Sequence, residues 1–282
     1  MAKARTVNGA GLGLRQQMIP ELQQQVPAGI HFFEVAPENW LGCGGQSART
    51  LRAFTERYPF VCHGLSLSLG GPAKLDHDLL KRIRRFMQDH DMALYTEHLS
   101  WCSDDGQLYD LLPLPHTGEA VRWAADRIGE AQDILGRRIG IENASTYLRP
   151  PGGEMTESDF IRAVVEEADC LLHLDVNNLW VNSRNFGFDP REALRDLPLD
   201  RTCYIHVAGH DVEADGLCVD THGAPVIDPV WQLLVDVYRW IGPVPTCLER
   251  DTNIPALPDL ADEVRTIASL QLNHGLRQQE AM

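Results

Sequence analysis

The chain has 282 residues, of which 44% are hydrophobic and 23% are charged, an ordinary balance for a globular protein with a full core. Asp and Glu number 40 against 25 Lys and Arg, so the formal net charge is −15. This charge argues against nucleic-acid binding, which depends largely on neutralising phosphates.

Nothing in the sequence indicates export or a membrane. The N-terminus lacks the apolar segment of a signal peptide, and no stretch approaches the ~20 apolar residues of a membrane span. The seven cysteines are odd in number and contain no Cys-x-x-Cys pair, which is typical of reduced, mostly buried thiols. We therefore expect a cytoplasmic protein without a membrane partner.

Eight apolar strand candidates alternate with eight helical candidates along the chain. We expect strands at about residues 9–15, 30–35, 60–69, 93–101, 138–143, 170–176, 202–208 and 245–250. The helices are expected at about residues 16–26, 46–57, 76–89, 117–135, 157–168, 190–196, 228–240 and 259–272. Such alternation predicts a parallel sheet, and eight repeats predict a closed (β/α)8 TIM barrel. No flexible linker divides the chain, so we expect one domain over residues 1–282.

Six of the expected strands carry a histidine or a carboxylate toward their C-terminal ends, which in this architecture face the active site. These residues are His63, His98, Glu142, Asp175, His206 and Glu249. Three further ligand-type residues lie nearby in sequence, namely Asn178, Asp220 and His222. Imidazoles and carboxylates without clustered thiolates favour Zn, Fe(II) or Mn over a structural cysteine-zinc site. Nine candidates exceed the needs of one ion, which predicts two or three metals bridged by carboxylates.

Each candidate also has a structural interpretation. A lone strand-end histidine is often a hydrogen-bonded core residue, and a buried carboxylate could pair with Arg15 or Arg250. Each buried polar side chain would need its own hydrogen-bond or charge partner, and nine such partners are hard to supply in one protein. His210, on the loop that leaves the seventh strand, is interpreted as supporting a ligand or facing substrate. The other histidines are interpreted as structural or solvated: His31, His77, His90, His116, His173 and His274. No nucleophile motif occurs, so no catalytic residue is assigned apart from the metal ligands.

Eight stretches carry a more specific signal, and they cover most of the chain in order. They are residues 33–40, 63–71, 97–101, 142–147, 174–178, 204–210, 220–223 and 248–251. These stretches resemble those of the multinuclear non-heme iron-dependent oxidative enzymes, the family of the methanobactin-biosynthesis iron oxidase.

The resemblance implies a xylose isomerase-like barrel that binds two or three irons in a mixed-valent Fe(II)/Fe(III) state, with O2 as co-substrate. It implies modification of cysteine residues in a ribosomally synthesised precursor peptide, and a co-encoded partner protein that binds the peptide leader. The nine candidates match the family's ligand positions, with Glu142 and Glu249 as bridging ligands. Glu97, Asn143 and Arg250 are expected, like His210, to support ligands or to face substrate.

Other classes of protein remain open at this point. The same order of ligand types resembles the trinuclear-zinc apurinic endonucleases, where a histidine is expected in place of Asn178. A metal-dependent hydrolase or phosphodiesterase of that type is the alternative function, although the net charge of −15 argues against its basic groove. A sugar isomerase would need a Lys or His acid–base pair that we cannot place. A metal-binding scaffold would need no open coordination position.

Overall fold

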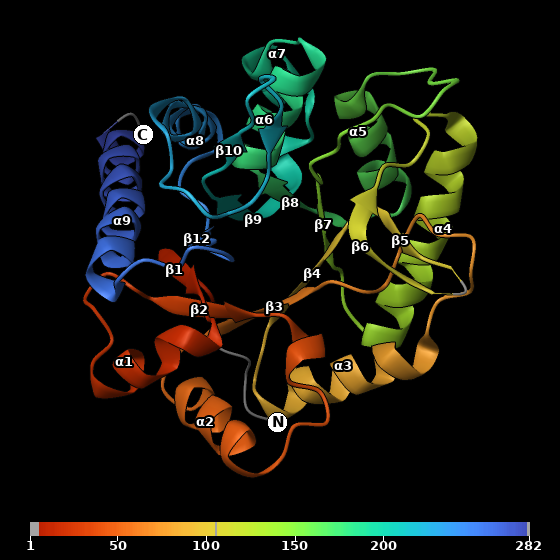
Figure 1. Cartoon of the computed structure of the whole chain (residues 1–282). Coiled ribbons are helices and arrows are strands. Elements are labelled where there is room, and N and C mark those ends of the chain that lie inside the picture. Colours follow the sequence, from red (N-terminus) through yellow and green to blue (C-terminus); the bar gives the residue numbers. More distant parts are fainter. Residues whose placement is uncertain (1–5, 105, 281–282) are drawn as a thin grey trace.

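Eight parallel strands close into a barrel at the centre of the molecule (Figure 1), in the computed structural model, which describes residues 6–104 and 106–280. The strands pair in the order β1-β12-β9-β8-β7-β4-β3-β2. Their bounds are Ala10–Gly13 (β1), Phe32–Val35 (β2), Phe60–Gly64 (β3), Leu94–His98 (β4), Gly140–Glu142 (β7), Leu171–Asp175 (β8), Thr202–Val207 (β9) and Thr246–Leu248 (β12). The predicted TIM barrel is confirmed.

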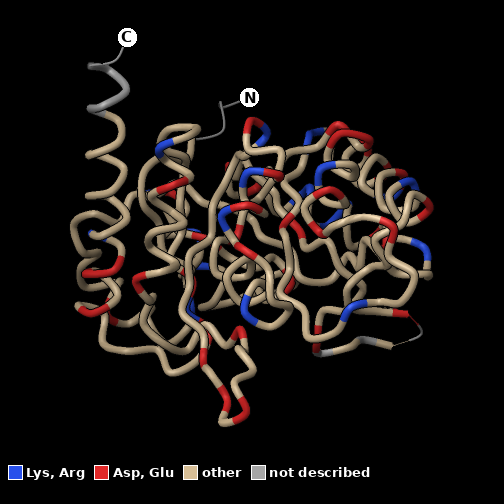
Figure 2. Tube along the Cα trace, turned by 90° about the horizontal axis from the view of Figure 1, so that it is seen from above, with Lys and Arg blue, Asp and Glu red and all other residues tan. Residues whose placement is uncertain are grey.

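Helices surround the barrel and cover its outer face (Figure 1). They are Ile19–Gln24 (α1), Gly45–Thr55 (α2), His77–Asp89 (α3), Gly118–Leu135 (α4), Glu157–Glu167 (α5), Val176–Phe186 (α6), Pro190–Asp196 (α7), Asp228–Ile241 (α8) and Leu257–Glu280 (α9). None of these described helices is both long enough and apolar enough to cross a membrane. Lys and Arg lie interspersed among the more numerous Asp and Glu around the molecule (Figure 2).

One helix, α6, was not predicted. It begins directly at the end of β8, where the Asp175 carboxylate accepts a hydrogen bond from the Asn178 backbone N–H at 2.7 Å. This N-cap satisfies one of the free N–H groups of the first turn. The helix ends at Gly187, whose φ of 71° is the left-handed conformation that favours glycine. The sequence interpretation extended the strand to Val176 and placed the next helix only at residues 190–196, because no glycine or proline separates the strand from α6.

All eight barrel strands are shorter than predicted, and two of them end several residues early. The segment 60–69 pairs in the barrel only as far as Gly64, and 93–101 only as far as His98. Beyond Gly64, side chains take the backbone donors that a ladder would use: Glu38 accepts from the Leu65 N–H at 2.9 Å, and Glu97 accepts from the Leu67 N–H at 3.3 Å. Two hairpins lie outside the barrel, formed by Trp101–Ser103 (β5) with Gln107–Leu112 (β6) and by Asp211–Val212 (β10) with Cys218–Val219 (β11).

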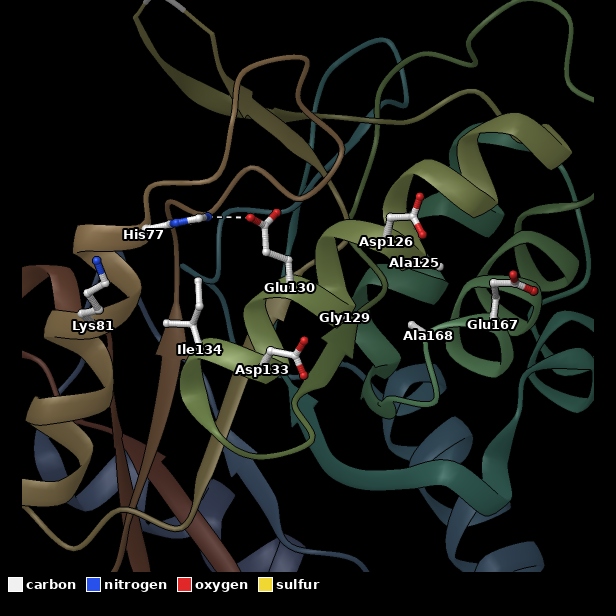
Figure 3. A pocket seen from close by; sticks show the side chains of 10 residues that line it. All are labelled: His77, Lys81, Ala125, Asp126, Gly129, Glu130, Asp133, Ile134, Glu167 and Ala168. Carbon is white, nitrogen blue, oxygen red and sulfur yellow. Dashed lines mark hydrogen bonds and ion pairs between the residues drawn. The ribbon is translucent and has the colours of Figure 1, made fainter.

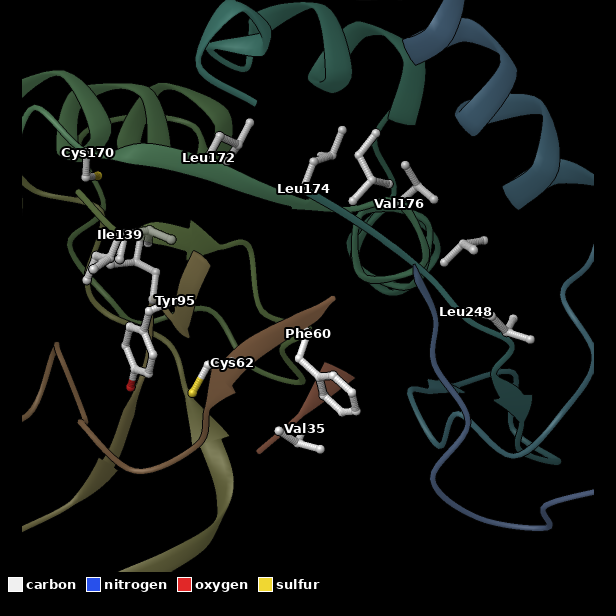
Figure 4. Close-up of a cluster of buried hydrophobic side chains, with 14 of the residues drawn as sticks. Val35, Phe60, Cys62, Tyr95, Ile139, Cys170, Leu172, Leu174, Val176 and Leu248 are labelled. Carbon is white, nitrogen blue, oxygen red and sulfur yellow. The ribbon is translucent and has the colours of Figure 1, made fainter. Parts of the chain in front are cut away.

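Alternating residues of each strand serve two cores. Outward-facing side chains such as Leu172 and Leu174 project from one side of β8 and pack under the helices (Figure 4). Inside the barrel a smaller cluster contains Phe32, Val61 and Tyr204, all fully buried. The registers bring His98 beside Glu142 and Asp175 beside His206, so ligand-type residues form the next layer up.

Leu174 provides a test of the outer core. Its side chain is fully buried, so Leu174→Ala should lower the free energy of unfolding by about 2–5 kcal/mol through lost burial and a cavity. Chemical denaturation monitored by circular dichroism measures this change. Leu272→Ala, at a residue that is 67% exposed, is the control and should change stability by less than about 0.5 kcal/mol. Equal effects of the two substitutions would contradict the packing described here.

Candidate metal centre

The nine predicted ligands lie together at the mouth of the barrel. They form one connected network in which every contact between side-chain nitrogen or oxygen atoms is 3.9 Å or shorter. Six of them stand at the ends of β3, β4, β7, β8, β9 and β12, and Asn178 lies in the first turn of α6. Asp220 and His222 reach the same place from the loop that follows β11.

Glu142 is the centre of the first half of the network. Its Oε2 atom lies 3.1 Å from His63 Nε2 and 3.4 Å from His98 Nε2. Its Oε1 atom lies 3.7 Å from His206 Nδ1 and accepts a hydrogen bond from Asn178 Nδ2 at 3.3 Å. One carboxylate therefore faces three imidazoles and an amide in the barrel interior.

Glu249 is the centre of the second half. Its Oε2 atom lies 2.9 Å from His206 Nδ1 and 3.4 Å from His222 Nδ1. His222 Nε2 in turn lies 2.8 Å from Asp220 Oδ1, and Asp175 Oδ2 lies 3.9 Å from His206 Nδ1. His206 thus joins the two halves.

Two groups of three side chains offer ligand atoms that lie within 4.8 Å of one another, and both consist of predicted ligands. They are His63, Glu142 and His206, and Asp175, His222 and Glu249. A third such group, Glu34, His206 and Cys247, lies deeper in the barrel and shares His206 with the first.

Several buried atoms of the network make no hydrogen bond of acceptable geometry with any described residue, although His206 Nδ1 and His222 Nε2 lie within 2.9 Å of carboxylate oxygens. These atoms are Glu142 Oε2, Asp175 Oδ2, Asn178 Oδ1, His206 Nδ1 and His222 Nε2. An unsatisfied buried polar atom costs about 1–3 kcal/mol, and native structures contain few of them. All five are atoms with lone pairs that bind divalent cations. The residues present therefore fit a metal centre.

The protonation of the network reflects its crowding. Burial lowers the pKa of His63 well below the ordinary value, assisted by the neighbouring imidazole of His98. Burial also opposes a charge on His98, but the carboxylates of Glu142 and Glu97 outweigh it and raise the pKa of His98 to about 9. Burial and the Glu142 carboxylate raise the pKa of Asp175 well above its usual range. Without a metal cation, the negative charge of the carboxylates is balanced by bound protons and by protonated imidazoles.

Three of the predicted supporting residues contact the network or its backbone. Asn143 exchanges two hydrogen bonds with the backbone of Asp175, at 2.8 and 2.9 Å, and so fixes the end of β8. Glu97 accepts from the His98 backbone N–H at 3.1 Å. His210 Nδ1 lies 2.8 Å from Asn177 Oδ1, and the Asn177 amide donates to Asp220 at 2.7 Å. Each residue therefore positions a predicted ligand.

Arg250 differs from these three. Its neighbour Glu249 points into the barrel, so alternation along the chain turns Arg250 toward the outer helices. There its buried guanidinium pairs with Glu263 of α9 at 2.6 Å. The side chain lies in the barrel wall rather than facing the mouth.

The sequence interpretation missed two buried residues beside the network. Glu34, in β2, places Oε2 at 2.7 Å from His206 Nε2. His173, interpreted as structural, lies 3.6 Å from Glu142 Oε2, and neither of its ring nitrogens has a hydrogen-bond partner among the described residues. The alternation of strand residues could have indicated His173, because it lies two residues before Asp175 and shares its face.

The interpretation that a carboxylate pairs with Arg15 holds for Glu249, since their side chains approach to 3.1 Å. Arg15 also reaches Asp251 at 2.6 Å, and Asp251 lies 2.8 Å from His222 Nδ1. His222 has a φ of 49°, a conformation that costs energy in residues other than glycine. The backbone is strained at the residue that presents this imidazole.

The loop between β7 and α5 holds Asp220 from the other side. The Ser145 hydroxyl donates to Asp220 Oδ2 at 2.9 Å, and the Tyr147 hydroxyl accepts from the Asp220 backbone N–H at 3.0 Å. The Thr146 N–H donates to Asn182 Oδ1 of α6 at 2.8 Å. This loop therefore connects the network to α6.

The Asn182 amide also donates to Glu157 at 2.9 Å, and burial raises the pKa of Glu157 from 4.5 to about 7. A raised folded-state pKa stabilises the folded protein fully below pH 4.5, and this contribution is lost as the pH rises through 7. Glu157→Gln keeps an acceptor for Asn182 and should raise the thermal midpoint by a few degrees at pH 8, but little at pH 5. Thermal unfolding at both pH values measures the difference. Glu154→Gln, at an exposed residue, is the control, and equal effects at both pH values would contradict this account.

A separate surface groove of about 600 Å³ lies on the outside of the barrel (Figure 3). It is lined mainly by α4, with His77 and Lys81 on one side and Glu167 on the other. None of its lining residues belongs to the nine-residue network. The chemistry of the barrel mouth therefore gives the stronger candidate site.

Barrel and network together define a TIM barrel with a candidate metal centre. Among solved structures, 3-keto-D-glucoside 4-epimerase from E. coli matches with a TM-score of 0.60 at 12% identity, covering 94% of this chain and 99% of that one. Endonuclease IV from Thermus thermophilus matches with a TM-score of 0.53 at 15% identity, with the same coverage of 94% and 99%. Likeness at this level of identity shows the fold alone.

The chain belongs to the family of RiPP precursor modification enzymes described as MbnB/TglH/ChrH, whose model matches residues 9–272. A UPF0276 protein of Nitrosospira multiformis is 60% identical over 264 residues, covering 94% of this chain and 93% of the relative. A UPF0276 protein of Pseudomonas aeruginosa is 53% identical over 269 residues, covering 95% and 94%. The family membership makes this chain an enzyme that acts on a ribosomally synthesised precursor peptide.

Proposed function

We propose that this enzyme is a multinuclear iron, O2-dependent oxidase that modifies cysteine residues of its precursor peptide. The observation that carries the proposal is the network of nine ligand-type residues with buried atoms that lack hydrogen-bond partners. The RiPP modification family supplies the peptide substrate. Two separate three-residue groups support more than one metal ion.

The proposed ligands are His63, His98, Glu142, Asp175, Asn178, His206, Asp220, His222 and Glu249. Iron held by them would supply redox chemistry with O2 and Lewis-acid activation of a substrate thiol. Glu142 faces imidazoles with both of its oxygens, which supports its proposed role as a bridging ligand. Glu249 faces His206 and His222 with Oε2 alone, while its Oε1 pairs with Arg15, so Oε2 is the atom that would be shared. Asn178 offers a neutral amide oxygen, a weaker ligand than the others.

Other side chains position the proposed ligands and offset part of their negative charge. Arg15 pairs with Glu249 and Asp251, which offsets part of the negative charge beside His222. Asn143 fixes the backbone of Asp175 from the neighbouring strand. These contacts keep the ligand side chains in place before substrate arrives, which is the preorganisation that catalysis requires.

Exposed apolar side chains near the mouth suit a peptide substrate. Leu65 follows β3 and is 39% exposed, while Tyr147 and Leu148 follow β7 and are 45% and 50% exposed. Large exposed apolar side chains gathered at a site mark surfaces that bind partners. We propose that they contact the peptide around the reacting cysteine.

The proposal includes three expectations from the sequence: a co-encoded partner protein that delivers the peptide leader, a cytoplasmic location, and a single domain without nucleic-acid or membrane partners. Co-purification of the enzyme with the product of a neighbouring gene, with and without the precursor peptide, tests the first of them. Failure of every neighbouring product to bind would overturn the partner proposal.

Metal analysis of protein purified anaerobically, with Mössbauer and EPR spectroscopy of the same sample, tests the function. We expect two or three irons per chain and a coupled mixed-valent signal. Addition of a cysteine-containing precursor peptide and O2 should then yield a mass change on the cysteine. Stoichiometric zinc without functional iron would overturn the proposal and favour the alternative metal-dependent hydrolase, to be assayed with phosphodiester substrates.

A further inference from the structure

A cavity of about 790 Å³ lies beside the metal centre, between the β7–α5 loop, α6 and α7. We call it the α6–α7 cavity. Its apolar lining includes Met155, Leu179, Phe186 and Phe188. None of the nine proposed ligands lines it, so the cavity is a site separate from the metal centre.

The polar lining of the α6–α7 cavity is strongly acidic. Glu192 and Asp196 are four residues apart in α7 and share one face of that helix, and Asp189, its N-cap, lies three residues before Glu192 and accepts from the Arg191 N–H. Glu154 and Glu157 line the cavity from the β7–α5 side. Five acidic side chains therefore surround an apolar surface, four of them as carboxylates and Glu157, whose pKa is about 7, as a partly protonated group.

Two guanidinium groups lie near these carboxylates, and one of them, Arg162, donates to the Asp196 backbone oxygen from outside the lining. Arg149 is the only Lys or Arg among the lining residues, and its guanidinium lies 4.6 Å from the centre of the Phe186 ring. His116 also lines the cavity, but burial lowers its pKa and so keeps its imidazole neutral. Because Arg149 already covers the Phe186 ring, the carboxylates rather than this ring are the groups available to a further cation.

The cavity is connected to the metal centre through one face of α6. Asn178, Asn182 and Phe186 are spaced four residues apart, so they line the same side of the helix. Asn178 contacts Glu142, Asn182 contacts Thr146 and Glu157, and Phe186 lines the cavity. Eight residues of helix span roughly 12 Å, which is the length of about three to four residues of extended peptide.

We propose that the α6–α7 cavity binds a lysine or arginine side chain of the peptide substrate, three to four residues from the modified cysteine. An apolar lining with an acidic rim matches the aliphatic stem and charged end of such a side chain. The same lining opposes an acidic or phosphorylated segment, because like charges would be brought together. This inference rests on the proposed function, since it places the cysteine at the metal centre.

The test measures binding of two fluorescein-labelled decapeptides by fluorescence anisotropy. Each contains one cysteine, followed four residues later by lysine in one peptide and by norleucine in the other. Full-length protein purified anaerobically should bind the lysine peptide about tenfold more tightly, through several partly exposed charge pairs. This preference should fall at high salt, because screening weakens such pairs.

The test variant is the double substitution Glu192→Gln with Asp196→Asn, at two exposed residues of α7. It should reduce the preference for lysine to less than about twofold. The control is Asp126→Asn with Glu167→Gln, which removes the same charge from the separate groove of Figure 3 and should leave the preference intact. Equal preference in both variants and the original protein would overturn the inference.

Iron content and cysteine modification, measured on the same preparations, separate the two proposals. Absence of any charge preference in a protein that holds iron and modifies cysteine overturns the cavity inference alone. A lysine preference that depends on Glu192 and Asp196, in a protein that never modifies cysteine, overturns the proposed function and supports a cation-binding cavity. A lysine preference for every spacing from the cysteine contradicts the predicted separation.

Discussion

Glu142→Gln is expected to remove most of the bound iron and to lower the rate of peptide modification by about a hundredfold or more. The Glu142 carboxylate lies 3.1–3.7 Å from His63, His98 and His206, and its Oε2 atom makes no hydrogen bond with any residue that the structure describes. Glutamine has nearly the same size, but it replaces one acceptor oxygen with an NH2 group and removes the charge. The variant therefore tests the proposed bridge without creating a cavity.

The iron content and the rate with a cysteine-containing peptide are both measured for this variant. Glu130→Gln is the control, because Glu130 pairs with His77 on the surface at 2.5 Å and its side chain is 45% exposed. The control should retain iron and activity. Circular dichroism separates loss of metal from loss of fold. Normal iron content and a normal rate in Glu142→Gln would show that Glu142 is a structural carboxylate.

Glu34→Ala is expected to weaken metal binding by about 10- to 100-fold, although Glu34 belongs to neither of the two groups formed by predicted ligands. Its Oε2 atom lies 2.7 Å from His206 Nε2. This contact leaves the Nδ1 atom of His206 facing Glu142 and Glu249. A carboxylate behind a ligating imidazole fixes its tautomer and its orientation, and makes it a better ligand.

Competition with a chelator of known affinity measures the metal affinity of this variant. Glu34→Gln should have the smaller effect, because its amide oxygen can still accept a hydrogen bond from His206 while the charge is lost. The thermal midpoint of each metal-free variant is also measured, because a general loss of stability would lower this midpoint in both variants. Unchanged metal affinity in Glu34→Ala would mean that His206 does not depend on Glu34.

The barrel could be predicted because each repeat carries its own signal. Apolar strands of a few residues alternate with helices, and the eightfold count leaves a closed barrel as the simplest arrangement. The junction at Asp175 could not be predicted, because the N-cap of α6 is also the last residue of β8. The strand predicted over residues 60–69 was too long, because the side chains of Glu38 and Glu97 accept hydrogen bonds from the backbone after β3 and end the strand pairing. Such contacts are not visible in the sequence.

The convergence of nine ligand-type residues could be predicted for a related reason, since a parallel barrel brings all of its strand ends to one face. Contacts between side chains of strands that are far apart in the sequence could not be predicted. Glu34 and His206 are 172 residues apart in the chain, and nothing local marks them as a pair. His173 was interpreted as structural because it stands between leucines in an apolar strand. The turn of Arg250 toward Glu263 follows from alternation, which the sequence interpretation did not apply after β12.

The positions of the two hairpins have a consequence for how enzymes of this kind diverge. Six of the proposed ligands stand at the ends of barrel strands, whereas β5–β6 and β10–β11 are separate two-stranded sheets outside the barrel register. Insertions or substitutions in surface hairpins are tolerated well, because they leave the barrel hydrogen bonds unchanged. Changes in β5–β6 can therefore accumulate without moving the ligands at the strand ends, whereas β10–β11 is less free to change, because Asp220 and His222 directly follow β11.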